Sequence, residues 1–180
     1  MLAAASLMRL CDLENVKILF RGKSYNLKIT KSPFAKSSLT RGEDTIILKL
    51  SSLPKTEDEL VAEARFQVFK WLKAEARRYF LLEVESARVA YGFKYKDLSV
   101  KDTVSRWGSC SAQKNLNFNW RLVMAPPEIL KYVVMHELAH LEHLNHSTEF
   151  WNLVAARYPK YKEAQKWLAD KGLELLEFTI

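Results

Sequence analysis

The chain has 180 residues, of which 48% are hydrophobic and 27% are charged. This length and balance are typical of one soluble globular domain with a substantial core, and no internal repeat or low-complexity segment is visible. The net charge of +7 makes acidic or phosphate-bearing partners plausible, including nucleic acid. A solvated lysine-rich surface is the simpler interpretation of that charge.

Cysteine usage and the N-terminus exclude two further classes. Cys11 and Cys110 form no CxxC motif and lie far apart, which gives no disulfide framework and suits a reducing compartment. The N-terminal stretch MLAAASLMRL is apolar, but it lacks a positive segment and reaches Arg9 early. It is too short for a membrane span and a poor signal peptide. We therefore expect a cytoplasmic protein with no membrane partner.

Residues 1–55 are predicted to form an N-terminal β-hairpin region. The stretch VKILFRGKSYNLKI alternates apolar and polar residues around a turn at Arg21-Gly22-Lys23, which is typical of a hairpin. The stretch DTIILKL, residues 44–50, is a further predicted strand.

Residues 56–180 are expected to form one compact unit that begins with a long helix. Thr56 is a candidate N-cap, followed by three acidic residues that favour the positive end of the helix dipole. Apolar residues then recur at helical spacing from Glu57 to Tyr91, as one long helix or two in tandem, and Gly92 ends the pattern.

The rest of the chain contains short strands followed by helices. Strands are predicted at 95–102, 105–111 and 116–125, and a helix at 127–144 starts with Pro127 in its first turn. Two amphipathic helices follow, and Gly172 is expected to close the last. This order predicts an α+β fold with a mixed or antiparallel sheet, rather than alternating βαβ units.

All four histidines lie in the stretch HELAHLEHLNH, where His136, Glu137 and His140 form an HExxH motif. Four residues of an α-helix advance about 400°, so the two imidazoles share one face and can reach one metal ion. Glu137 lies about 100° round the helix, where a carboxylate can accept a proton from metal-activated water. The motif predicts a metal site with Glu137 as the catalytic base.

His146 is the candidate third ligand, if the chain turns back after the helix. Asn145 tolerates the left-handed conformation that ends helices, and Ser147 can start a new helix. On a straight helix His143 would lie roughly 10 Å beyond His136, so it is expected beside the ligands rather than among them. Three histidines and a water complete a tetrahedral catalytic site, and one Zn²⁺ per chain is the expected cofactor. The H-x3-H-x5-H spacing equals that of the metzincins, but His143 stands where they have glycine.

These motifs carry a family resemblance. The stretches SRWGSCS, LNFNWRL and YVVMHELAHLEHLNHSTEFW together resemble the YgjP-like family of zinc metallopeptidases, relatives of the gluzincin-like and SprT-like zincins. The resemblance is specific from Arg106 to Trp151 and looser over the rest of the chain. It implies a zincin-type fold with a mixed sheet over two long helices, one bearing HExxH. It also implies zinc bound by His136, His140 and His146, with Glu137 as the base.

Four residues of the same block are candidates for substrate binding. In a zincin, the strand beside the active helix binds an extended peptide, and either 105–111 or 116–125 could serve. Gly108 would permit close approach of another backbone, and Arg106 could hold an anionic group or the developing oxyanion. Asn117 shares a face with Asn119 and could orient substrate, and Arg121 is a further candidate.

Three functions are compatible with these residues. A zinc metallopeptidase follows from the motif and the resemblance. A nucleoside triphosphate pyrophosphatase using the same metal would suit Arg106, Lys114 and Arg121, since phosphates need charge-assisted donors. A binding module with structural zinc is the third, and it would need His143 or Cys110 to close the metal's coordination.

Overall fold

The computed structural model describes residues 9–33, 36–51 and 55–179, so the apolar stretch 1–8 lies outside the described residues. The chain folds into two compact units, one extending to Trp71 and the other spanning Leu72–Thr179. The long helix α2, Glu57–Tyr91, contributes its first part to one unit and its remainder to the other.

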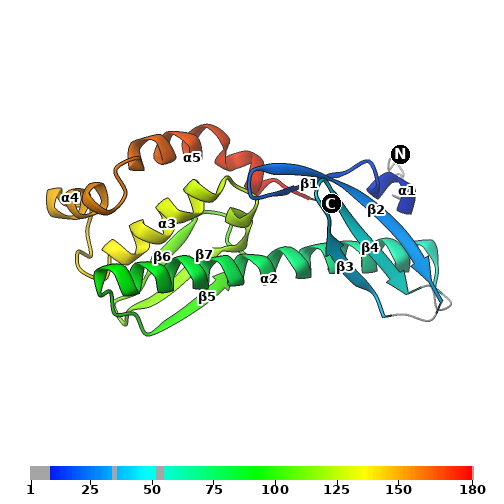
Figure 1. The fold of residues 1–180 in the computed structure, drawn as a ribbon, viewed down its shortest axis with the longest axis horizontal. Helices are drawn as coiled ribbons and strands as arrows, with labels where there is room; N and C mark the ends of the chain where they lie inside the picture. Colours follow the sequence, from blue (N-terminus) through cyan, green and yellow to red (C-terminus); the bar gives the residue numbers. More distant parts are fainter. Residues whose placement is uncertain (1–8, 34–35, 52–54, 180) are drawn as a thin grey trace, which may run out of the picture. The chain divides into compact units, whose positions relative to one another are not determined.

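The first unit contains a four-stranded mixed sheet in the order β1-β2-β4-β3 (Figure 1). The hairpin prediction is confirmed, because Arg21 and Gly22 both adopt positive φ between the two antiparallel strands, as a type I′ turn requires. The last strand pairs in parallel with β2, which the sequence pattern did not indicate. The elements are α1 (Leu10–Leu13), β1 (Lys17–Phe20), β2 (Lys23–Ser32), β3 (Ser38–Arg41) and β4 (Thr45–Ser51).

Alternation along β4 builds the core of this unit. Ile46, Leu48 and Leu50 are fully buried, while the residues between them are exposed. The first turns of α2 add Ala64 and Val68, which are also fully buried. The hydrophobic effect therefore holds this sheet by a regular period-two pattern.

Helix α2 is one continuous helix with the predicted ends. The Thr56 hydroxyl accepts a hydrogen bond from the Glu59 amide, and the Glu59 carboxylate accepts one from the Thr56 amide, which completes a capping box. Gly92 follows the last turn at φ 76°, in the left-handed region that glycine occupies at little cost. Local signals at both ends thus determine the length of this helix.

The second unit contains a three-stranded mixed sheet in the order β5-β7-β6, followed by helices. Asn119 ends β7 earlier than predicted, because its side chain accepts a hydrogen bond from the Arg121 amide and starts a 3₁₀ turn. The elements are β5 (Asp97–Lys101), β6 (Gly108–Cys110), β7 (Asn115–Asn119), η1 (Trp120–Val123), α3 (Pro127–Ala139), α4 (Thr148–Arg157) and α5 (Tyr161–Leu176). Mixed sheets followed by helices confirm the α+β prediction.

Two aromatic contacts organise the second unit. Phe118 of β7 stacks on Phe80 of α2, with ring centroids 4.5 Å apart and planes at 13°.

Gly172 lies inside α5, whereas the sequence predicted that it would end this helix. A Cβ at that position would come within 3.0 Å of the Trp107 ring, so the glycine makes room for the indole.

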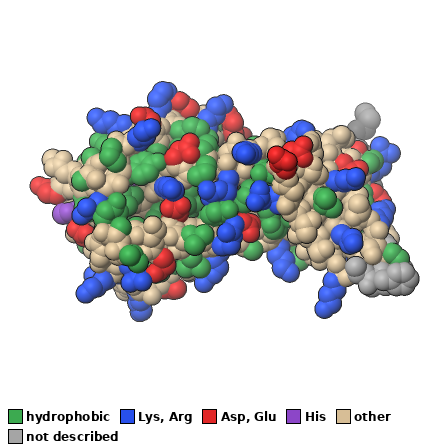
Figure 2. Space-filling view, in the orientation of Figure 1, with side chains coloured by type: hydrophobic (Ala, Val, Ile, Leu, Met, Phe, Trp, Pro, Cys, Tyr) green, Lys and Arg blue, Asp and Glu red, His purple; other side chains and the backbone are tan. Residues whose placement is uncertain are grey.

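The positively charged side chains are dispersed on the face of the molecule that Figure 2 shows. On the face visible in Figure 2, Lys and Arg side chains are scattered among Asp and Glu. Within the residues described, no helix is long and apolar enough to cross a bilayer.

Candidate metal centre

The end of α3 positions the HExxH motif. His136 and Glu137 lie in its last turn, and His140 is the C-cap residue, with its amide donating to the His136 carbonyl. The helix was expected to continue to residue 144. It ends at Ala139 instead, because the Leu141 and Glu142 amides bond three residues back, which tightens the chain into a turn.

The chain then turns back and starts α4. The Asn145 side-chain oxygen accepts a hydrogen bond from the Ser147 amide, and the Ser147 hydroxyl caps the new helix by accepting from the Phe150 amide. The Ser147 prediction is confirmed. The prediction of a left-handed conformation at Asn145 is wrong, because within the described ranges only Arg21 and Lys114 have positive φ among non-glycine residues. The chain reverses through the Asn145 side-chain hydrogen bond instead of through a left-handed backbone conformation.

This turn brings three imidazoles together. One ring nitrogen from each of His136, His140 and His146 lies within 4.8 Å of the others. The Nε2 atoms of His136 and His146 are 3.1 Å apart. Two nitrogens on one tetrahedral zinc ion, bound at about 2.0–2.1 Å, are separated by roughly 3.3 Å, so this spacing fits a shared metal.

Hydrogen bonds and burial prepare His136 and His140 as candidate metal ligands. His140 donates from Nδ1 to the His143 carbonyl at 2.9 Å, which leaves its Nε2 lone pair free for a metal. His136 Nδ1 lies 3.5 Å from the Tyr132 hydroxyl. Burial, reinforced by His140 and His146, lowers the pKa of His136 to about 4. His143 thus supports a candidate ligand through its main chain rather than through its imidazole.

Two aromatic residues of α4 hold the rings in place. Phe150 stacks on His140 with centroids 4.5 Å apart, and Trp151 stacks on His146 at 5.5 Å. Trp151 is itself stacked on Tyr161 of α5. Sequence reasoning assigned no role to these aromatic residues, although their position directly after the Ser147 cap is the signal that could have indicated one.

Glu137 is a buried carboxylate that follows His136 in the last turn of α3. Its side chain is 5% exposed, and no hydrogen bond to it is present within the described part of the chain. Burial raises the pKa of Glu137 to about 8, and the Arg106 guanidinium opposes that rise. Glu137 and His136 both line a cavity of about 240 Å³. The carboxylate therefore faces the space next to the candidate metal ligands.

Gly108 gives Glu137 the room to lie there. A Cβ at position 108 would be 2.6–2.8 Å from the Oε1, Cγ and Cδ atoms of Glu137, closer than real Cβ atoms approach their neighbours. The sequence predicted close approach of a backbone at this glycine. The structure brings the Glu137 side chain there.

Strand β6 presents an edge beside this carboxylate. The Asn119 amide donates to the Trp107 carbonyl at 2.8 Å, and the Ser111 amide donates to the Asn115 carbonyl at 3.0 Å. Because facing and outward residues alternate in an antiparallel pair, the main-chain groups of Gly108 and Cys110 point away from β7. Strand β7 lies between β5 and β6, so the stretch 116–125 offers no edge.

Comparison with known proteins identifies a family for this sequence. The sequence matches the family described as YgjP-like, metallopeptidase domain, over residues 5–171. This chain belongs to the YgjP-like family. Among solved structures, the metallopeptidase zymogen jannalysin of Methanocaldococcus jannaschii is similar at 21% identity and a TM-score of 0.46, over 51% of this chain and 95% of its own. No curated protein matches this chain.

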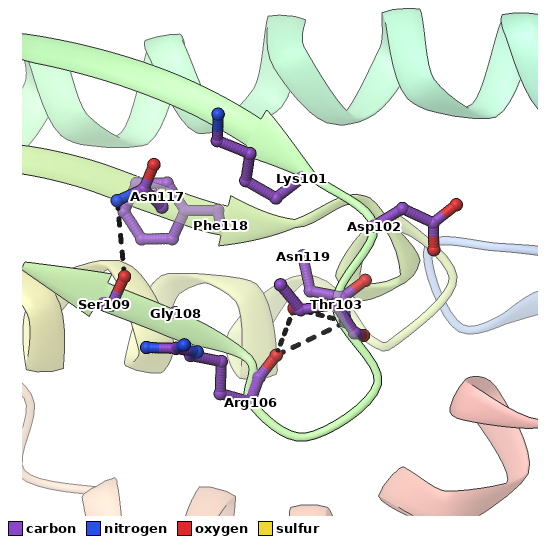
Figure 3. Close-up of a pocket in the computed structure, with 9 residues that line it drawn as sticks. All are labelled: Lys101, Asp102, Thr103, Arg106, Gly108, Ser109, Asn117, Phe118 and Asn119. Carbon is purple, nitrogen blue, oxygen red and sulfur yellow. Dashed lines mark hydrogen bonds between the residues drawn. The ribbon is translucent and has the colours of Figure 1, made fainter.

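The remaining substrate candidates of this YgjP-like chain separate in space. Arg106 and Asn117 line a cavity of about 440 Å³ on the three-stranded sheet (Figure 3). Arg121 does not line it, because it pairs with Asp102 and lies over the Trp120 ring. Lys114 does not line it either and occupies the turn before β7, at φ 63°.

Asn119 is a structural residue that sequence reasoning left open. Its side chain is 1% exposed and donates to the Thr103 carbonyl at 2.7 Å and to the Arg106 carbonyl at 3.4 Å (Figure 3). These bonds hold the 102–106 loop against the sheet. Asn119 thereby fixes the position of the Arg106 main chain.

Proposed function

We propose that this chain is a zinc-dependent metallopeptidase with a zincin-type active site. In this proposal His136, His140 and His146 hold one zinc ion, and Glu137 is the general base. The observation that carries it is the meeting of three imidazole nitrogens within 4.8 Å, with the buried Glu137 carboxylate lining a cavity that His136 also lines. Membership of a metallopeptidase family supports the same conclusion.

Zinc bound to these imidazoles would act as a Lewis acid that lowers the pKa of water and polarises the scissile carbonyl. Glu137 would accept the proton of the attacking water and pass it to the leaving amine. Burial raises the pKa of Glu137, which strengthens its carboxylate as a proton acceptor, and the Arg106 guanidinium opposes that rise. Gly108 leaves room for the Glu137 side chain, and the two residues line the same cavity.

The free edge of β6 supports a peptide as the substrate. An extended chain could pair with the outward N–H and C=O groups of Gly108 and Cys110 by strand addition. This pairing would hold the substrate backbone next to Glu137, which lies against Gly108. It requires no particular side chain, so it provides affinity without sequence preference.

A phosphoanhydride substrate has less support. The pyrophosphatase hypothesis needs Arg106, Lys114 and Arg121 to act on one ligand. Only Arg106 lines the cavity, while Arg121 is held by Asp102. We therefore favour peptide hydrolysis.

The central test is Glu137→Gln, which removes the base and keeps the size of the side chain. We expect it to retain one zinc per chain by mass spectrometry and to lose about 10²–10⁴-fold in peptide turnover, the usual contribution of a general base. Glu142→Gln, on an exposed residue of the same turn, is the matched control and should keep full activity. Undiminished peptide turnover by Glu137→Gln would remove Glu137 from the mechanism.

His140→Ala separates the metal from the base. It should lower zinc occupancy and abolish turnover, since only two imidazoles would remain. A digest of casein or a peptide library should be run beside a panel of nucleoside triphosphates. Phosphate release that vanishes in Glu137→Gln, with no peptide cleavage, would replace our proposal by the nucleotide hydrolase.

A further inference from the structure

The cavity on the three-stranded sheet has no role in the chemistry described so far. Its volume is about 440 Å³, room for a side chain. It crosses the sheet face that carries Asn117 of β7 and Ser109 of β6, and it shares Gly108 with the cavity of Glu137 (Figure 3). It therefore adjoins the proposed active site.

The cavity offers hydrogen-bond donors with few acceptors. The Asn117 amide donates to the Ser109 hydroxyl oxygen at 3.3 Å, which leaves the Ser109 O–H free to donate. The Thr103 hydroxyl donates to the Arg106 carbonyl, so it is already used. The Arg106 guanidinium makes no hydrogen bond or ion pair within the described ranges of the chain. It supplies up to five N–H donors.

The single carboxylate of the cavity is already paired. Asp102 forms ion pairs with Arg121 and, at 3.3 Å, with Lys73, neither of which lines the cavity. Asp102 therefore does not pair with Arg106, and Glu137 acts on the Arg106 guanidinium electrostatically without an ion pair in the described ranges. Lys101 also lines the cavity from β5, with its side chain directed away from Arg106 in Figure 3, and it adds positive charge. A ligand that only accepts hydrogen bonds and carries negative charge complements this lining.

Strand geometry brings a substrate side chain to this cavity. A peptide paired with the outward groups of Gly108 and Cys110 would have one residue directly opposite Ser109. Opposed residues of neighbouring strands project to the same face, about 4.5–5.5 Å apart at Cβ. The side chain of that residue would lie beside Ser109, on the face with Asn117. In Figure 3 the Arg106 side chain lies along β6 beside Gly108, within reach of the same position.

We propose that this cavity is a specificity subsite for a carboxylate of the peptide substrate, held by Arg106 and Ser109. The planar guanidinium matches a carboxylate with two parallel hydrogen bonds. The inference rests on the proposed peptidase function and adds a substrate class to it: peptides with Asp or Glu, or a free C-terminus, close to the scissile bond.

The test compares matched peptides that differ by one charge. A neutral sequence cleaved by the wild-type protein is blocked at both ends, and Glu or Gln is placed at each position flanking the cleaved bond. At one position the wild type should prefer Glu in kcat/KM by about tenfold, the value of one charge-assisted hydrogen bond. Arg106→Gln should reduce that ratio to about one, and Arg106→Glu should prefer Lys over Glu. Arg78→Gln, on an exposed arginine of α2 that pairs with Glu75, should leave it unchanged.

The ratio, rather than the rate, decides the outcome, because Arg106 also lies near Glu137 and its loss can lower turnover of every peptide. A Glu preference that persists in Arg106→Gln would overturn the subsite, and so would the absence in wild type of any preference for Glu at every position and for a free C-terminal carboxylate. A third series, with Gln and a free C-terminal carboxylate, separates the two sources. A preference confined to that series supports the subsite and assigns it to the peptide terminus.

Binding to Glu137→Gln distinguishes this proposal from the proposed function. Fluorescence anisotropy with the labelled Glu and Gln peptides should give a ratio of dissociation constants that Arg106→Gln removes. If wild type cleaves no peptide while the ratio holds, the peptidase proposal fails and the anion site stands. If wild type cleaves the Glu, Gln and free C-terminal peptides equally and all three bind equally, the subsite fails and the peptidase stands.

Discussion

The two sheets of this protein are built on different principles. In the four-stranded sheet, strands of up to 10 residues alternate buried and exposed positions, and the buried ones are apolar. In the three-stranded sheet the strands have 3 to 5 residues. Two polar side chains are buried here, Asn119 at the end of β7 and Glu137 on α3. In β4 of the first sheet, burial follows the period-two pattern of the apolar residues.

The difference shows what the chemistry requires of the fold. A buried carboxylate without a described partner costs free energy that apolar residues would not. Glycine at the sheet edge gives up side-chain packing so that the carboxylate can lie against the backbone. The second sheet therefore departs from the period-two pattern where the proposed active site needs it.

Gly108→Ala should break the comparison most strongly. The added methyl group would overlap the Glu137 side chain, whose carboxylate must move away. We expect turnover to fall by about 10²-fold, as for a misplaced catalytic group, with zinc content and melting temperature nearly unchanged. Gly42→Ala, in the turn between β3 and β4 of the first sheet, where a Cβ would meet only the Thr45 carbonyl at 3.4 Å, is the matched control. Equal activity of both variants would contradict the role of Gly108.

Leu48→Ala tests how much apolar burial stabilises the first sheet. Leu48 is fully buried, so the substitution leaves a cavity and should lower the free energy of unfolding by roughly 2–5 kcal/mol in urea titrations. Zinc stoichiometry of the folded variant should stay at one per chain. Loss of zinc from folded protein would show that the two sheets are not independent in this respect.

Asn119→Ala should have an intermediate effect. It removes the donor to the Thr103 and Arg106 carbonyls, which remain close to a buried position, so we expect a loss of about 1–3 kcal/mol in stability. Asn117→Ala removes a single, longer hydrogen bond on the half-buried outer face and serves as the comparison. A smaller loss for Asn119→Ala than for Asn117→Ala in thermal melts would be inconsistent with the loop-holding role.

Ile47→Thr should change least. Ile47 is 40% exposed on the outer face of the four-stranded sheet, and threonine keeps the β-branched shape that strands favour. The free energy of unfolding should stay within about 0.5 kcal/mol of wild type. A larger loss would mean that this face is covered in solution, which sedimentation analysis would then detect as association.

Local signals made much of this fold predictable. The capping box at Thr56, the glycine after α2 and the turn at Arg21 each act within a few residues, so the sequence contains all the information they need. The convergence of His136, His140 and His146 could be predicted from spacing and one turn, while their role as ligands stays a prediction. The cytoplasmic location likewise stays a prediction.

Tertiary interactions account for the rest. The parallel pairing of β2 with β4 depends on partners far apart in sequence, which periodicity does not identify. Arg121 pairs with Asp102 and does not line the cavity of Arg106, although the sequence suggested that the two arginines belong to one basic cluster. The close approach of Gly108 to Glu137 joins a strand to a helix. None of these has a signal within a single stretch of sequence.

The glycine inside α5 has a consequence for how freely this protein can change. Gly172 borders the Trp107 ring, and Trp107 directly precedes the strand whose edge faces the proposed substrate. Any larger residue at 172 would have to displace that ring by a few tenths of an ångström. The C-terminal helix and the substrate edge are therefore coupled through one contact, and randomised libraries of this protein should show changes at 172 associated with changes at 107.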